Sequence, residues 1–480
     1  MRSRLFRTSA VTLLLTLGAC GSDDGGSGAK STGGAGGAGG GTGGGTSGSG
    51  GTQATGGAGG TMAGGSGGAG GSSTGGASGT GASSGTGATS GTGGGSSTGC
   101  MAGDFLASLG KTKVMVGAAM EDSIAKSAPF DLRYQYLSGG IADGAGPCAK
   151  CDTGCAAGGK SCANSGPGCA WWGCWQYDKD PPGAFVRDFV KKAKADQQVP
   201  MLTYYMLLQA SGVSEGQAEV TKANDAAFMA RYYADFRFVA QQIGSEVAFL
   251  HIEPDFWGYA QQVNDDPTKI PAAVASANSQ DCGSLPNTMA GMGTCMITMA
   301  KKYAPNVKVS LHGSGWATKF DVLLNKDSSF DVAGHAGKLG AFLAAAGPNA
   351  DFITVDAADR DAAWYESQGQ NRWWDDTNAK LPNFHQAFAW SKALGDAAKK
   401  PIFWWQLPVG NMAQSNSNDH WKDNRVDYFL GHMGEVAAAH GIGAAFGAGA
   451  GGQTTPSTDG GNLVSKVKAY SAGGGQAPCP

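Results

Sequence analysis

The chain lacks the sequence motifs of several common enzyme and binding classes. No His-Glu-x-x-His pair supplies zinc ligands on a helix, and no Gly-x-Gly-x-x-Gly turn follows the first predicted strand. Basic residues do not cluster and the formal net charge is −3, which argues against nucleic acid as a partner. The 7 histidines are scattered along the sequence. We therefore expect no metal and no cofactor.

The N-terminus has the features of an export signal. Three arginines precede a short apolar run at 11–17. Such a run is too short for a bilayer, which needs about 20 residues, but it fits the core of a signal peptide. The next residues, Leu17–Cys20 (Leu-Gly-Ala-Cys), resemble the bacterial lipobox. We predict a signal peptide at 1–19 and a lipid on Cys20; the alternative is an ordinary signal beside an accidental cysteine.

Two parts of different composition follow the signal. Residues 20–99 are almost entirely Gly, Ser, Thr and Ala, so they cannot bury enough apolar surface to offset their ordering entropy. Residues 100–480 hold every tryptophan and tyrosine and are long enough for one large domain. We predict a disordered linker that carries a single domain, which we expect to be monomeric. Since Gly21 rather than Asp follows the lipidated cysteine, Gram-negative sorting rules favour the outer membrane.

The cysteines agree with an oxidising compartment. Of the 11 cysteines, Cys20 is the predicted lipidation site, and the even number left is consistent with disulfides. We predict a local pair between Cys282 and Cys295 and a bridge between Cys100 and Cys479 that joins the domain ends. The other six lie in an insertion at about 139–177, where a zinc site is the alternative. This insertion is interpreted as a rigid lid over a site or as a structural knob.

Short apolar runs alternate with helical patterns along the domain, which is typical of repeated strand–helix units. A (β/α)8 barrel is predicted, with a doubly wound open sheet as the alternative. Strands are expected at 113–119, 132–137, 200–208, 247–252, 307–311, 352–355, 402–407 and 443–446. Helices are expected at 182–195, 225–243, 289–303, 337–346, 384–399 and 425–440. In such barrels the site lies at the C-terminal ends of the strands.

The fourth predicted strand ends in His251-Ile252-Glu253-Pro254-Asp255. Because alternate strand residues face the same side, His251 and Glu253 are expected to point into the barrel, and Asp255 continues that parity. Two carboxylates at a barrel mouth suit glycoside hydrolysis, in which one acid protonates the leaving oxygen. The alternative is a buried acid held by an arginine or by backbone donors.

Acids and aromatic residues also gather at the other predicted strand ends. Asp356 and Asp359, after the sixth strand, are the further catalytic candidates. Aromatic rings suit the C–H faces of sugars, while amides and acids bind their hydroxyls. The predicted substrate-binding residues are Tyr134, Trp172, Trp175, Tyr204, Tyr205, Trp257, His312, Trp316, Trp373, Trp374, Trp405, Gln406 and Asn411.

The Glu253-Pro254-Asp255 segment resembles the Glu-Pro-Asp segment of glycoside hydrolase family 6, inverting cellulases with a distorted barrel. Residues 306–316 are similar to the strand of that family that runs into a Gly-His-x-Gly-Trp turn. The resemblance covers about 199–316 and implies that Asp255 is the proton donor. The third-strand Arg-Asp pair and the Lys-x-Gly-Gly-Glu element of the family are not found here. The His-Ile-Glu-Pro sequence is likewise similar to endo-mannanases of another barrel family.

We therefore expect a cell-surface glycoside hydrolase that acts on a polysaccharide. Asp255 is the predicted general acid, Glu253 raises its pKa or holds a sugar hydroxyl, and Asp356 or Asp359 acts as the base. A non-catalytic glycan-binding or adhesion domain is the first alternative, favoured by Gln406 where many barrel hydrolases carry a carboxylate. An envelope-structural lipoprotein is the second. The sequence identifies neither the polysaccharide nor the stereochemical outcome.

Overall fold

The structure, a computed structural model, describes residues 99–138, 141 and 183–479. The predicted signal peptide, the lipid site Cys20, the linker and the cysteine-rich insertion with Trp172 and Trp175 lie outside the described residues. They stay predictions.

Eight parallel strands close into a barrel in sequence order, and β1 pairs with β8 to complete it. This confirms the predicted (β/α)8 barrel over the open sheet. The strands are β1 (Met115–Ala118), β2 (Leu132–Ser138), β3 (Val199–Tyr205), β4 (Phe249–Ile252), β5 (Lys308–Gly313), β6 (Phe352–Val355), β7 (Ile402–Leu407) and β8 (Gly441–Phe446). Five of them, β1, β4, β6, β7 and β8, are buried along their whole length, because the barrel interior covers one face and helices cover the other.

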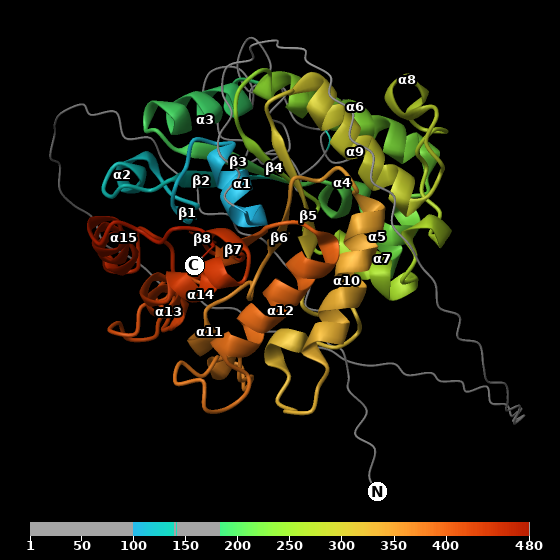
Figure 1. The fold of residues 1–480 in the computed structure, drawn as a ribbon. Coiled ribbons are helices and arrows are strands. Elements are labelled where there is room, and N and C mark those ends of the chain that lie inside the picture. The colour runs from blue at the N-terminus through green and yellow to red at the C-terminus, as the bar shows by residue number, and fades with distance from the viewer. Residues whose placement is uncertain (1–98, 139–140, 142–182, 480) are drawn as a thin grey trace, which may run out of the picture. The chain divides into compact units, whose positions relative to one another are not determined.

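Helices surround the barrel and form its outer layer (Figure 1). The longer ones are α3 (Ala184–Ala195), α6 (Ala226–Ile243), α9 (Met289–Tyr303), α10 (Val332–Ala346), α12 (Phe384–Ala398) and α15 (Asn462–Ala472). The shorter ones are α1 (Met101–Ala107), α2 (Asp122–Ala125), α4 (Leu207–Ser211), α5 (Gln217–Lys222), α7 (Phe256–Val263), α8 (Ser279–Cys282), α11 (Ala362–Ser367), α13 (Arg425–Gly431) and α14 (Met433–Ala438), with single 3₁₀ turns η5 (Pro267–Lys269) and η6 (Val322–Leu324).

Side-chain caps fix the start of four of the long helices, α6, α9, α10 and α12, as their sequences indicate. Asp225 accepts hydrogen bonds from the backbone N–H groups of Ala227 and Phe228 at the start of α6. Thr288 and Asn383 do the same for α9 and α12. Each cap satisfies a backbone donor that the helix leaves unpaired, which contributes about 1 kcal/mol. The apolar face of each helix then packs on the outward-facing strand residues.

Three predicted elements have a boundary that is wrong by three or more residues. The helix predicted to begin at residue 337 begins at Val332, where Asp331 caps it. The third strand ends at Tyr205 rather than at residue 208, because Leu207–Ser211 turns into α4. The helix predicted over 425–440 is two helices, α13 and α14, with His432 outside helical geometry between them. Gly431 and Gly434 flank this break, and glycine lowers helix stability by about 1 kcal/mol relative to alanine.

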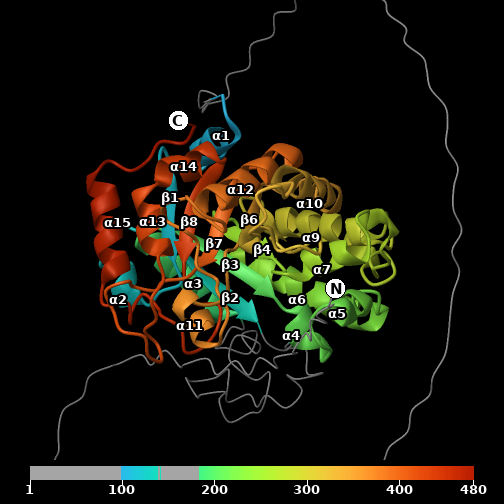
Figure 2. The ribbon, with the colours of Figure 1, turned by 90° about the horizontal axis from the view of Figure 1, so that it is seen from below.

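The N-terminal end of the barrel is closed by an apolar plug. Phe105 of α1 lies against Phe249 and Phe352, with ring centroids 5.7 and 5.4 Å away. Figure 2 shows α1 at one end of the barrel and the arrowheads of β2 and β3 toward the other. The candidate acids therefore lie at the opposite end of the barrel, where the strands end. We call that end the barrel mouth.

Two disulfides lie within the described residues, and both were predicted. Cys100 is bonded to Cys479, with Cα atoms 6.1 Å apart, so the bridge joins the two ends of the domain. Cys282 is bonded to Cys295, with Cα atoms 5.5 Å apart, and links α8 to α9. None of the helices in the described part of the chain is both long and apolar enough to cross a membrane.

Candidate active site

The turn that follows β4 determines which acid reaches the barrel mouth. Glu253 and Asp255 both have positive backbone φ angles, 48° and 65°. Residues other than glycine seldom adopt this conformation, and such backbone is concentrated at functional sites. The alternation of inward-facing and outward-facing side chains, which we predicted to continue past Ile252, stops at Glu253. Asp255 remains at the mouth, while the side chain of Glu253 turns away from it.

Glu253 is a buried anchor between β3, β4 and α6. Its Oε1 atom accepts hydrogen bonds from the backbone N–H groups of Met206 (3.1 Å) and Leu207 (3.0 Å). The hydroxyl of Tyr232 on α6 donates to the same oxygen at 2.7 Å. Burial raises the pKa of Glu253 to about 7, although the three donors act to lower it. The prediction that Glu253 points into the barrel is wrong, and the buried-acid alternative describes it better.

Asp255 is the half-buried acid at the mouth. Ser314, just beyond β5, donates a hydrogen bond from Oγ to Oδ1 of Asp255 at 3.3 Å. Burial raises the pKa of Asp255 well above its usual range, and the charges of Asp356 and Asp359 raise it further. Three carboxylates from the ends of β4 and β6 thus share one electrostatic environment. Glu215 and Glu219 also raise the pKa of Asp255, so the effect that we predicted for Glu253 comes chiefly from other carboxylates.

Asp359 lies in the loop after β6 and is held by side chains of two other strands. Gln406, at the end of β7, donates from Nε2 to Oδ1 of Asp359 at 3.4 Å, and Tyr136 of β2 donates its hydroxyl proton to Oε1 of Gln406. Desolvation and the charges of Asp356 and Glu215 raise the pKa of Asp359 to about 6, while Arg360 acts in the opposite direction. Because the side chain of Asp359 is exposed to solvent, we attribute most of this shift to the neighbouring carboxylates and not to burial.

Beneath the acids, a row of hydrogen-bonding side chains crosses the barrel interior. Thr203 Oγ1 lies 3.3 Å from Nδ1 of His251, and Nε2 of His251 lies 3.1 Å from Nδ1 of His312. Nε2 of His312 lies 3.2 Å from Oδ1 of Asp356. The indole of Trp405 on β7 packs edge-on against both imidazoles, with centroid distances of 4.7 and 5.8 Å. Asp356 is therefore the end of this row that reaches the mouth.

Aromatic rings with accessible edges lie near Asp255. Trp316, after β5, and Tyr259, on α7, have ring centroids 4.5 Å apart, and both are half-buried. Tyr205 at the end of β3 is also half-buried, and the charge of Asp255 contributes to its raised pKa after burial itself. These three rings present the flat, partly wet surfaces that sugar rings favour.

Five other predicted substrate-binding residues are buried in the core, each with less than about 2% of its surface exposed. Tyr204 points outward to Asp235 of α6, which accepts its hydroxyl proton at 2.8 Å. Trp257 donates from Nε1 to the carbonyl oxygen of Ile252, and Trp374 packs between Phe384 and Trp404. Tyr134 and Trp405 face the barrel interior below the mouth. Their bulk shapes the site without presenting an open ring face.

Two further predicted residues are bound into loops. Trp373 is half-buried and donates from Nε1 to Glu366 at 3.2 Å. Asn411 donates to the carbonyl oxygen of Asp459 and accepts from the backbone N–H of Ala413. The structure thus gives each a local partner, and no contact described here joins either to Asp255 or Asp356.

Two acids near the mouth were missed by the sequence analysis. Glu215 and Glu219 lie in the segment after β3, and both raise the pKa of Asp255. Burial raises the pKa of Glu219 itself to about 8. We expected the third strand to run to residue 208, which obscured the short helices that bring these acids back to the mouth. The glycines at 212 and 216, both with positive φ, were the available signal.

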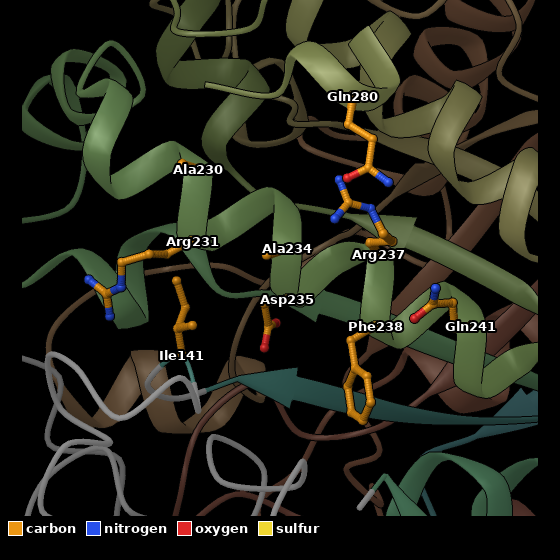
Figure 3. A pocket seen from close by; sticks show the side chains of 9 residues that line it. All are labelled: Ile141, Ala230, Arg231, Ala234, Asp235, Arg237, Phe238, Gln241 and Gln280. Atoms are coloured by element: carbon orange, nitrogen blue, oxygen red, sulfur yellow. The ribbon is translucent and has the colours of Figure 1, made fainter. Parts of the chain in front are cut away.

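No group of three or more His, Cys, Asp or Glu residues suited to a metal ion occurs among the described residues. A cavity of about 670 Å³ lies beside α6 (Figure 3). Its lining includes Arg231, Asp235, Phe238 and Gln280. The lining residues come from α6, from α8 and from Ile141, which follows β2, and none of them is a candidate catalytic acid.

No family model matches this chain, and no curated protein matches it. Among solved structures, it is similar to the endoglucanase Cel6 from Mycobacterium tuberculosis, with 15% identity and a TM-score of 0.26 over 46% of this chain. The chain spans only 56% of the length of that endoglucanase.

It is also similar to a glycoside hydrolase family 5 mannosidase from Rhizomucor miehei, with 12% identity, a TM-score of 0.40, and coverage of 75% of this chain and 93% of the other. A family 26 endo-β-1,4-mannanase from Cellulomonas fimi gives 12% identity, a TM-score of 0.37, and coverage of 60% and 57%. The solved structures named here are glycoside hydrolases, but likenesses this low say nothing about the chemistry of this chain.

Proposed function

We propose that the barrel mouth cleaves glycosidic bonds in a polysaccharide, with Asp255 as the general acid. The observation that carries the proposal is the placement of Asp255 beside Asp356 and Asp359. Burial and these two neighbouring charges raise the pKa of Asp255 well above its usual range, which favours its protonated form. A carboxylic acid that keeps its proton at working pH is what protonation of a leaving oxygen requires.

The proposed reaction uses two carboxyl groups in opposite states. Asp255 gives its proton to the glycosidic oxygen as the bond from that oxygen to the anomeric carbon breaks. Asp356 or Asp359 takes a proton from the water that attacks the anomeric carbon. One proton leaves the site on the departing sugar and one arrives from water, so the charge of the site is conserved. The base then releases its proton to solvent and Asp255 takes one up before the next turnover.

Aromatic rings next to Asp255 support a sugar as the substrate. The rings of Trp316 and Tyr259 contact each other and are partly exposed, and Tyr205, the last residue of β3, is also partly exposed. Each ring offers an apolar face, while the surrounding carboxylates accept hydrogen bonds from hydroxyl groups. This mixture suits a polyhydroxylated ring better than a purely apolar or an anionic ligand.

One observation favours a non-catalytic glycan-binding domain as the second candidate. The end of β7 carries Gln406, whose amide is held between Tyr136 and Asp359. An amide can bind a sugar hydroxyl but can neither attack a sugar carbon nor take up a proton near neutral pH. If Asp356 and Asp359 also fail to act as a base, the mouth binds glycan without turnover.

The deciding experiment compares the full chain with its Asp255→Asn variant on a panel of soluble and insoluble polysaccharides, scored by released reducing ends. We expect the variant to lose roughly 10²- to 10⁴-fold in rate, which is the usual contribution of general acid catalysis. Asp376→Asn, on an exposed loop, is the matched control and should keep full activity. Full activity of the Asp255→Asn variant contradicts the proposal, and glycan binding by the wild type without turnover selects the second candidate.

We also propose that the barrel is displayed from a membrane by the lipid on Cys20 and the glycine-rich segment. A polymer too large to enter a cell needs an enzyme outside it. The predicted linker has a root-mean-square span of about 50 Å, from roughly 5–6 Å times the square root of its residue number. That reach is sufficient to lift the barrel away from the membrane surface.

A further inference from the structure

The row of polar side chains beneath the mouth has a definite donor and acceptor count. It runs from Thr203 on β3 through His251 on β4 and His312 on β5 to Asp356 after β6. Thr203, His251 and His312 are at most 1% exposed. Burial lowers the pKa of His251 well below its usual range, and the neighbouring His312 lowers it further. His251 is therefore a neutral imidazole, which donates from one ring nitrogen and accepts at the other.

If Asp356 at one end of the row is an acceptor, and each imidazole carries one proton, the donor and the acceptor of every hydrogen bond in the row follow. An ionised Asp356 only accepts, so Nε2 of His312 carries the proton and donates to it. When the His312 ring carries this single proton, it accepts at Nδ1, and the donor to that atom is Nε2–H of His251. Nδ1 of His251 accepts in turn from the hydroxyl of Thr203. All three hydrogen bonds point toward Asp356, and no nitrogen of the two imidazoles is left without a partner.

We propose that His312, oriented by His251 and Thr203, is a positioning residue that keeps Asp356 ionised, so that Asp356 and not Asp359 is the base. This inference rests on the proposed hydrolysis and deepens it. Within the described residues, the hydrogen bond given to the side chain of Asp359 is the long one from the Gln406 amide, at 3.4 Å. Asp356 has an imidazole N–H at 3.2 Å that is backed by two further donors, and a polarised row of this kind stabilises the charged form of its terminal acceptor.

The surroundings of His312 suit this role. His251 faces it from β4, Asp356 from β6 and the uncharged ring of Trp405 from β7. Below the row lie Phe249 and Phe352, which close the N-terminal end of the barrel. The negative charge on Asp356 therefore lies at the mouth, where it also raises the pKa of Asp255 and favours the protonated form of that acid. The two acids are set in the opposite states that the reaction needs.

The first test reads the proton positions and needs no substrate. The full chain is prepared with ¹⁵N-labelled histidine, and the ring signals are assigned with His251→Gln and His312→Gln variants. We expect both rings to show the Nε2–H tautomer at neutral pH, with Nδ1 unprotonated. A proton on Nδ1 of His251, or an imidazolium signal for His312, would mean that the row is reversed or charged, and it would overturn the inference.

The second test uses the rate of hydrolysis as a function of pH. His312→Leu should lower kcat roughly 10- to 100-fold, the size of effect seen when hydrogen-bond partners of functional ligands are removed. Because Asp356 loses a donor to its charged form, the acidic limb of the profile should move to higher pH. His312→Gln, which keeps an N–H near the Nε2 position, should restore part of the rate.

Ser310→Ala is the matched control. Ser310 and Thr354 form a buried hydrogen-bonded pair at 2.7 Å in the same polar zone of the barrel, but outside the row. If Ser310→Ala and His312→Leu lose the same rate and the acidic limb of the pH profile does not move, His312 contributes only packing. That result would overturn the inference. Reversed tautomers in an active enzyme overturn this inference alone, whereas a wild-type chain that cleaves no polysaccharide overturns the proposed function and the base assignment with it.

Discussion

Glu253 offers the sharpest test of how the β4 turn is built, because it is fully buried and its acid form is favoured. Its pKa rises from 4.5 to about 7 in the fold. Each pKa unit corresponds to about 1.36 kcal/mol, so ionising Glu253 inside the protein costs about 3 kcal/mol more than ionising it in the unfolded chain. We use the Glu253→Gln substitution, which keeps an acceptor oxygen for Met206, Leu207 and Tyr232 but cannot ionise.

The sign of the pH dependence follows from the direction of the shift. A folded-state pKa above the unfolded value means that the folded protein holds the proton more tightly between about pH 4.5 and pH 7. The contribution of Glu253 to stability is fully present below the unfolded pKa and is lost as the pH rises through about 7. The free energy of unfolding of the wild type should therefore fall relative to Glu253→Gln by about 3 kcal/mol between pH 4 and pH 8.

The assay is urea unfolding followed by tryptophan fluorescence at several pH values, with the disulfides intact. Other titrating groups are common to both proteins and cancel in the difference. Glu121→Gln, at an exposed glutamate beside α2, is the control and should follow the wild type at every pH. A difference between wild type and Glu253→Gln that stays constant from pH 4 to pH 8 would refute the reasoning. The variant should also keep hydrolytic activity, since Glu253 lies outside the proposed acid pair.

The remaining predictions concern two tryptophans and the predicted lipid anchor at Cys20. Trp316→Ala should weaken glycan binding by up to roughly ten-fold with little loss of stability, because its ring is half-buried at the mouth. Trp374→Ala should leave glycan affinity unchanged but destabilise the fold by about 3–5 kcal/mol, because it is buried in the core. Calorimetric titration with oligosaccharides and urea unfolding separate the two outcomes, and a swap of these effects would contradict the assignment. Cys20→Ser should move the protein from the membrane to the soluble fraction of a Gram-negative host, and continued membrane association would exclude the lipid anchor.

Much of the fold follows from local sequence patterns. The observed bounds of β6 (Phe352–Val355), β7 (Ile402–Leu407) and α9 (Met289–Tyr303) coincide with the predicted ones. Each strand is a short apolar run that ends at a turn, and the long helices α6, α9, α10 and α12 each have a capping residue before their apolar stripe. These signals lie within a few residues of one another, so they can be seen without knowledge of distant contacts. The two disulfides of the described region were predicted as well, one because its cysteines are close in sequence and one because they flank the domain.

The composition of the mouth was predictable only in part. Placing Asp255, Asp356 and Asp359 at strand ends needed no more than the barrel itself. The orientation of Glu253 needed its positive φ, which no alternation rule contains. The roles of Trp316 and Trp374 differ because distant segments cover one ring and leave the other at the surface, although both lie in sequence regions rich in aromatic residues.

The sequence by itself determined the barrel, the order of its strands and the end at which the acids lie, because strand–helix alternation and strand polarity are local properties. Only the tertiary structure decided which acids share an environment and which side chains hydrogen-bond to them. Thr203, His251, His312 and Asp356 are brought together by neighbouring strands of the closed barrel, across gaps of many residues in sequence. Their hydrogen bonds depend on barrel register and burial, which are properties of the whole closed sheet and not of any single segment.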